Sequence, residues 1–288
     1  SASANIFVGQ TEAPLCIRPY IAGMTRSQIM AVMVGGFATI AGSVLAAYVG
    51  ILGGETEASR VLFAKHLMCA SVMSAPAGLV MAKIVLPETQ RPREETVSSL
   101  LTEARSTRNV VDAAAAGATD GLKLALNVAA MLVAFVALLA MLNYPIAAIS
   151  RLPRIASWRA QHGLPEYTLE YKLGSVLRPL VWTFGIAWQD CGRFGSLLGQ
   201  QVIATEFVAY LSLGEMIRNE ALDARSQQIA TYMLCGFANL PSIAIQIGGL
   251  SALAPERRAD FASLGPRAMV AGVLACWCTG CVAGLFLG

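Results

Sequence analysis

Two stretches of the chain nearly repeat one another. Residues 28–40 read Gln-Ile-Met-Ala-Val-Met-Val-Gly-Gly-Phe-Ala-Thr-Ile, and residues 228–240 read Gln-Ile-Ala-Thr-Tyr-Met-Leu-Cys-Gly-Phe-Ala-Asn-Leu, at a constant spacing of 200 positions. Each places a hydroxyl or amide side chain, Thr39 or Asn239, directly after Gly-Phe-Ala, and each follows a Thr-Glu pair. Hydrophobic segments interrupted at matching places are typical of transporters built from inverted repeats. The alternative is a chance similarity between two glycine-containing apolar helices.

The composition indicates an integral membrane protein. Of 288 residues, 56% are hydrophobic and only 14% are charged, whereas a soluble domain carries about 25% charged residues. The net charge of +3 is spread along the chain, so the sequence gives no sign of nucleic-acid binding. It also contains no HExxH, Walker or GxGxxG motif that would indicate an enzyme.

The apolar runs predict one membrane transport domain over residues 1–288. The chain starts inside functional sequence without a signal peptide, so we expect a fragment that lacks an N-terminal half. The fourth run, 173–213, is broken by charge and fits a re-entrant hairpin. Residues 96–116 predict an amphipathic helix, and small residues recur every fourth position from Gly272, as in close helix packing. The expected parts are a first hairpin tip and broken helix at 5–52, two transmembrane helices at 62–149 with a polar linker at 87–120, a second re-entrant hairpin and broken helix at 173–253, and a final transmembrane helix at 268–287.

Two acidic residues, Glu12 and Glu206, lie in stretches expected at membrane depth. An unpaired charge there costs about 2.5 to 3.5 kcal/mol, so such residues usually face a cavity or a partner. The functional interpretation is hydrogen bonding to a solute or proton carriage; the structural one is a salt bridge, for instance Glu12 with Arg18, or exposure at an interface. The neutral polar residues nearby suit an uncharged, hydroxyl-rich solute better than an anion: Gln10, Thr11, Asn239 and Ser242.

Several of these stretches resemble the concentrative nucleoside transporter family. They are residues 5–15 (Asn-Ile-Phe-Val-Gly-Gln-Thr-Glu-Ala-Pro-Leu), 35–45 (Gly-Gly-Phe-Ala-Thr-Ile-Ala-Gly-Ser-Val-Leu), 206–210 (Glu-Phe-Val-Ala-Tyr) and 235–239 (Cys-Gly-Phe-Ala-Asn). The resemblance implies an all-α integral membrane fold of inverted repeats, with re-entrant hairpins and discontinuous transmembrane helices. It also implies a homotrimer, an elevator-like movement, and a multi-pass protein of the plasma membrane, which in a bacterium is the inner membrane.

The resemblance further implies sodium-coupled symport of nucleosides into the cell, with no cofactor besides the coupling ion. It places Gln10, Thr11, Glu12 and Val44 around the nucleobase, and it places Glu206, Phe237, Asn239 and Ser242 around the ribose. It places Na+ between the first hairpin tip and the first broken helix, next to Asn5, Val8, Thr39 and Ile40. An all-oxygen set of ligands suits a hard cation.

The chain departs from the family pattern at two places. Thr205 stands where the family has Asn, and Leu240-Pro241 separates Asn239 from Ser242, which could shift the point at which the helix unwinds. Three alternatives remain open: a proton-coupled nucleoside symporter that uses Glu12 or Glu206, a passive channel, and a membrane-embedded enzyme.

Overall fold

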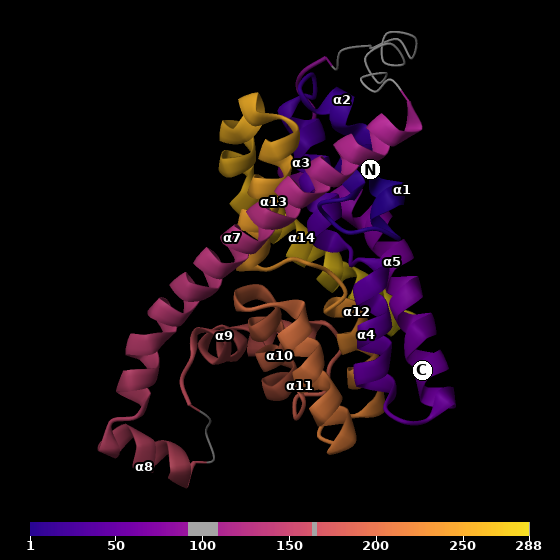
Figure 1. Ribbon diagram of the computed structural model, residues 1–288. Helices are drawn as coiled ribbons and strands as arrows, with labels where there is room; N and C mark the ends of the chain where they lie inside the picture. Colours follow the sequence, from indigo (N-terminus) through magenta and orange to yellow (C-terminus); the bar gives the residue numbers. More distant parts are fainter. Residues whose placement is uncertain (92–108, 163–165, 288) are drawn as a thin grey trace.

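The computed structural model describes residues 1–91, 109–162 and 166–287, which are all helical or irregular, with no strand in these ranges (Figure 1). In chain order the elements are α1 (Ala2–Asn5), the 3-10 turn η1 (Ala13–Ile17), α2 (Arg18–Ile21), α3 (Arg26–Ala38), α4 (Gly42–Gly53), α5 (Glu57–Val85), α7 (Val110–Ser150), α8 (Pro153–Gln161), α9 (Leu169–Thr183), α10 (Cys191–Ile203), α11 (Glu206–Arg218), α12 (Ala224–Met233), α13 (Leu240–Leu253), the 3-10 turn η2 (Pro255–Arg257) and α14 (Arg258–Phe286).

The helices match the expected apolar runs, and two of those runs are divided. The run at 28–52 is split into α3 and α4, and the run at 227–253 is split into α12 and α13. In the described part of the chain, α5 and the segment Pro255–Phe286 are long and apolar enough to cross a membrane. The final helix starts ten residues before the predicted position, because Pro266 is accommodated inside α14.

The expected crossing at 121–149 is the central part of a longer helix. α7 begins at Val110 because Asn109 caps it, its Oδ1 accepting the backbone N–H of Asp112 at 2.8 Å. The predicted amphipathic helix at 96–116 falls mostly outside the described residues, and its end belongs to α7. Figure 1 shows α7 crossing the molecule diagonally, and α13 packs against it.

The run at 173–213 contains three helices rather than the two arms expected. α9 is separated from α10 by a turn in which Gly185 has a φ of 83°, a conformation that favours glycine. α10 and α11 then form a helical hairpin, and the Thr205 side chain caps α11. α9 lies close against α10, because a Cβ on Gly174 would be 2.6 Å from the carbonyl oxygen of Gly195.

α14 packs against α3, α5, α12 and α13. Its predicted stripe of small residues lies against the ends of the divided helices. The Cys276 thiol faces the carbonyl oxygens of Ala38 and Cys235, both at 3.7 Å, and Gly280 lies beside Met233, the last residue of α12. A Cβ on Gly272 would collide with Phe37. The small side chains therefore allow α14 to approach the two interruptions of the fold.

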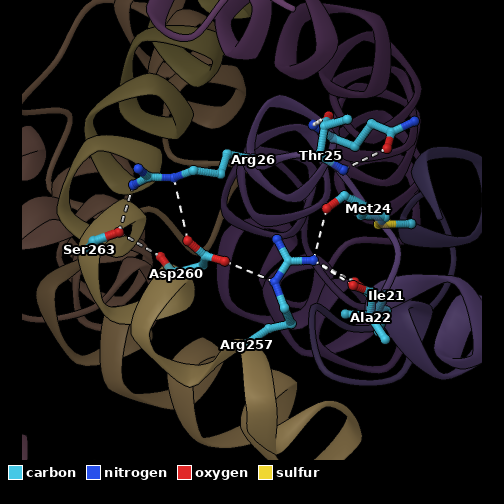
Figure 2. A network of polar contacts seen from close by, with 9 residues as sticks. Ile21, Ala22, Met24, Thr25, Arg26, Arg257, Asp260 and Ser263 are labelled. Atoms are coloured by element: carbon cyan, nitrogen blue, oxygen red, sulfur yellow. Dashed lines mark hydrogen bonds and ion pairs between the residues drawn. The ribbon is translucent and has the colours of Figure 1, made fainter. Parts of the chain in front are cut away.

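The start of α14 is joined to the loop before α3 by an arginine network (Figure 2). The Nη1 atom of Arg257 donates to the carbonyl oxygens of Ala22 and Met24 at 2.7 and 2.8 Å, where α2 leaves carbonyls without helical partners. Its Nε atom donates to Asp260 at 2.8 Å, and Asp260 also pairs with Arg26 at 3.4 Å. This network links the first and last parts of the chain.

Candidate functional site

The two interruptions touch each other. Thr39 and Asn239 both have extended backbones, and the N–H of Phe237 donates to the carbonyl oxygen of Thr39 at 3.3 Å. Asn239 caps the start of α13, because its Oδ1 accepts a hydrogen bond from the N–H of Ser242 at 2.8 Å. Pro241 lies in the first turn, where its missing N–H costs no helical hydrogen bond. The Leu240-Pro241 pair is therefore compatible with a helix that restarts right after Asn239.

Glu206 is the buried acidic residue beside these interruptions. It is the first residue of α11, and its side chain is 5% exposed. Its Oε1 accepts from the Tyr48 hydroxyl at 2.9 Å, and its Oε2 accepts from Asn239 Nδ2 at 2.8 Å. Among the described residues no ion pair involves Glu206. Neutral donors and the start of a helix therefore stabilise this carboxylate and leave lone pairs for a ligand.

Tyr48 was missed in the sequence. It lies on α4 one helical turn after Val44, so helical spacing would have placed both side chains on one face. It is fully buried and stacks on Tyr210 of α11 with ring centroids 4.2 Å apart. Val44 itself is half-buried, as is Phe237.

Gln10 connects the N-terminal segment to the start of α13. Its Nε2 donates to Ser242 Oγ at 3.3 Å, and its Oε1 accepts from Gln246 Nε2 at 3.0 Å. Gln246 was also missed, although it lies one helical turn after Ser242. Glu206, Asn239, Ser242 and Gln10 thus form one connected set of polar contacts from three parts of the chain.

Thr11 and Glu12 are less buried than the neighbouring Gln10. Glu12 is exposed and accepts a hydrogen bond from the Thr11 hydroxyl at 3.0 Å. Its carboxylate folds back over Gly9, where a Cβ would lie 3.1 Å from the Glu12 Cδ atom. The two predicted acidic residues therefore occupy different environments, one exposed and one buried.

The residues expected around Na+ lie partly together. Asn5 is 1% exposed, and its buried Oδ1 has no hydrogen-bond partner among the residues that the structure describes. Its amide faces Gly35, whose carbonyl oxygen accepts from Thr39 Oγ1 at 2.8 Å. Ile40 is buried at the interruption, whereas the Val8 side chain is 39% exposed. The unpaired oxygen of Asn5 is an atom that a small cation could satisfy, so these residues fit a hard cation.

Comparison with known proteins identifies the family. Residues 66–284 match the model of the Na+ dependent nucleoside transporter C-terminus, and residues 1–55 match a model described as nucleoside recognition. The chain belongs to the concentrative, Na+-dependent nucleoside transporter family. Members of this family are membrane transporters, so the assignment points to a transporter rather than to an enzyme.

Individual relatives agree with this assignment. The chain is 43% identical to solute carrier family 28 member 3 of Eptatretus stoutii and covers 41% of that protein. It is 42% identical to the uncharacterized transporter YutK of Bacillus subtilis (strain 168) and covers 66% of it. The chain therefore spans two fifths to two thirds of the length of these relatives.

Solved structures of the transporter CNTnw have the same fold. An outward-facing state of a doubly substituted CNTnw superposes with a TM-score of 0.83 at 44% identity, over 100% of this chain and 64% of that one. An inward-facing, substrate-bound state gives 0.75, also at 44% identity, over 99% and 63%.

Proposed function

We propose that the protein containing this chain is a sodium-coupled symporter that carries nucleosides into the cell. The observation that supports this function best is Glu206, a buried carboxylate held by donors from both divided helices. Tyr48 and Asn239 use one lone pair on each oxygen, and the remaining lone pairs can accept hydrogen bonds from ribose hydroxyls. An uncharged sugar suits this site, because a second anion would be repelled.

The nucleoside would lie between the residues around Glu206 and those around Gln10. Its ribose would contact Glu206, Asn239, Ser242 and Phe237, and its base would face the N-terminal segment through Gln10, Thr11, Glu12 and Val44. The family model and the relatives named as nucleoside transporters support a nucleoside as the ligand.

Sodium would bind beside the first interruption. Asn5 Oδ1 finds no hydrogen-bond partner in the described ranges, and the Thr39 hydroxyl lies one turn from Gly35. Val8 and Ile40 would complete the site through their backbone carbonyls. A membrane potential of about 100 mV supplies about 2.3 kcal/mol per charge. A tenfold sodium gradient adds about 1.4 kcal/mol, so one-to-one coupling supports accumulation of about several hundredfold.

The arrangement in the membrane is part of the same proposal. The α10–α11 hairpin would be re-entrant, and it would be related to the first hairpin by an inverted repeat. The chain would be one transport domain, with the expected parts at 5–52, 62–149, 173–253 and 268–287, in a homotrimer of a multi-pass plasma-membrane protein.

Uptake of labelled uridine into vesicles tests the function. Uptake should exceed equilibrium with an inward sodium gradient and fall to the diffusive level when K+ replaces Na+. E206Q should reduce uptake by about 10- to 100-fold, because hydrogen bonds to charged groups are stronger than neutral ones. E215Q, an exposed position on the same helix, is the matched control and should leave uptake unchanged.

Proton coupling is the second candidate, because Glu206 is buried and pairs with no cation among the described residues, and such a carboxylate can also carry a proton. Uptake that follows an imposed pH gradient and ignores sodium would replace the sodium proposal with this one. Asn5→Ala separates the two mechanisms further: it should raise the sodium concentration for half-maximal uptake by about tenfold. An unchanged sodium dependence would reject Asn5 as a ligand.

A further inference from the structure

Gln246 lies on α13 behind the predicted nucleoside site. Its side chain is 2% exposed, and its Nε2 donates to the carbonyl oxygen of Met33 and to Oε1 of Gln10, both at 3.0 Å. Its own Oε1 is buried and has no hydrogen-bond partner within residues 1–91, 109–162 and 166–287. A buried amide with one oxygen unsatisfied is costly, so its orientation calls for a physical reason.

The carbonyl of Met33 determines the orientation of both amides. A backbone carbonyl can only accept, so the Gln246 atom beside it must be the nitrogen. That nitrogen also faces Gln10, which must therefore present its oxygen to Gln246 and its nitrogen to Ser242. The Ser242 oxygen then accepts from Gln10, and the Ser242 hydroxyl hydrogen is free to donate elsewhere.

At the other end of this set of polar contacts, Glu206 determines which way the hydrogen-bond donors point. A carboxylate can only accept, so Asn239 presents its nitrogen to Glu206 and its oxygen to the N–H of Ser242. One end of the set therefore offers acceptors at Glu206. The end at Gln10 and Ser242 offers donors.

We propose that Gln246 is a positioning residue for base recognition, which holds Gln10 with its N–H atoms directed away from Gln246. The transporter would then select nucleosides whose base presents hydrogen-bond acceptors, such as carbonyl oxygens or unprotonated ring nitrogens. This inference rests on the proposed function, since it assumes that the base faces Gln10.

Gly36 supports the same role from a different helix. A Cβ at this position would lie 2.6 Å from Gln246 Nε2 and 3.1 Å from the Cβ of Gln10. The absence of a side chain on α3 therefore leaves the space in which the two amides meet. Gly36→Ala should displace the Gln246 amide and leave its chemistry unchanged.

The chain also contains a matched control. Gln201 on α10 is fully buried, and its Nε2 donates to the carbonyl oxygen of Met233 at 3.0 Å. In the described part of the chain its Oε1 likewise has no partner. Met233 is the counterpart of Met33 in the sequence repeat. Gln201→Met therefore removes the same kind of bond as Gln246→Met, but from a residue that does not contact Gln10.

The experiment measures equilibrium binding of nucleoside pairs by titration calorimetry on the purified transporter that contains this chain. One pair differs in the base: inosine against benzimidazole riboside, or uridine against phenyl riboside, the second member lacking polar atoms on the six-membered ring. The other pair differs in the sugar: each nucleoside against its 2′,3′-dideoxy analogue. The affinity ratio within each pair is the readout, because a general loss of stability would not change it.

Wild type should bind the base with acceptors at least about tenfold more tightly than its apolar analogue. Q246M and G36A should each lower that ratio by about five- to tenfold and leave the sugar ratio within about twofold, whereas Q201M should leave both ratios unchanged. Equal binding of the base pair by wild type would overturn the proposal even if a variant does not fold, and so would an unchanged base ratio in Q246M or G36A. A wild type that binds no nucleoside would instead refute the proposed function.

Discussion

Tyr48 and Glu206 are 158 positions apart in the chain, yet the hydroxyl of Tyr48 donates to Oε1 of Glu206 at 2.9 Å. Tyr48 belongs to the first divided helix, and Glu206 starts α11. The contact joins α4 to α11 at the buried carboxylate. It fixes one carboxylate oxygen, so it should matter more for ligand affinity than for the fold.

Tyr48→Phe should weaken nucleoside binding by about tenfold, because one donor to a buried carboxylate is lost. The ring would still stack on Tyr210, so the packing should be kept. Tyr210→Phe is the control: it removes a hydroxyl that donates to the carbonyl oxygen of Thr231 at 2.8 Å. Binding of uridine by calorimetry should be near wild type in that variant, and equal losses in both variants would contradict the role given to Tyr48.

Gly236→Ala should destabilise the protein. An added Cβ would lie 2.8 Å from the carbonyl oxygen of Phe37, which is backbone and cannot move aside cheaply. Overpacking of this kind costs about 1 to 3 kcal/mol, so the melting temperature in detergent should fall. Gly50→Ala on α4 meets no atom within 4 Å, and it should be neutral or slightly stabilising because alanine is the better helix former. Similar melting temperatures for the two variants would show that the interruptions are not closely packed.

Arg257→Met should lower the free energy of unfolding by about 2 to 3 kcal/mol, because carbonyls at the end of α2 and the carboxylate of Asp260 lose a charged donor. Arg26→Met is the comparison, since Arg26 is 53% exposed and its pair with Asp260 is long at 3.4 Å. Exposed pairs contribute about 0 to 1 kcal/mol. If denaturant unfolding shows a larger loss of stability for Arg26→Met than for Arg257→Met, the network in Figure 2 does not link the chain ends.

The hydrogen bond to Glu88 leads us to expect that the stability depends on pH. The Thr25 hydroxyl donates to its Oε2 at 2.7 Å, and with nearby Lys83 it lowers the pKa of Glu88 below the ordinary value of 4.5. A lowered carboxyl pKa in the folded state contributes stability above the unfolded pKa, and this stability is lost as the pH falls through the folded pKa. The difference in melting temperature between wild type and Glu88→Gln should therefore shrink as the pH falls from about 6 to about 3.5. A constant difference would mean that Glu88 does not titrate as the contact implies.

The sequence predicted the interruptions well because their signals are local. Gly236 lies between α12 and α13, Asn239 caps the start of α13, and Pro241 lies in its first turn. These residues favour the end of one helix and the start of the next whatever packs around them. The extra helix α9 was not predicted, although Gly185 and the polar pair Gln189-Asp190 both lie in the turn between α9 and α10. Val8 and Glu12 matched the family motif, but their side chains are exposed in the structure.

By itself the sequence determined the membrane class, the family and the positions at which two helices stop, because composition and local chain chemistry decide these. Only the tertiary structure decided which polar groups face one another. Tyr48 and Gln246 are ordinary helix residues until folding brings them to Glu206 and Gln10. Hydrogen bonds act over about 3 Å, so contacts between residues this far apart in the chain depend on how the divided helices pack.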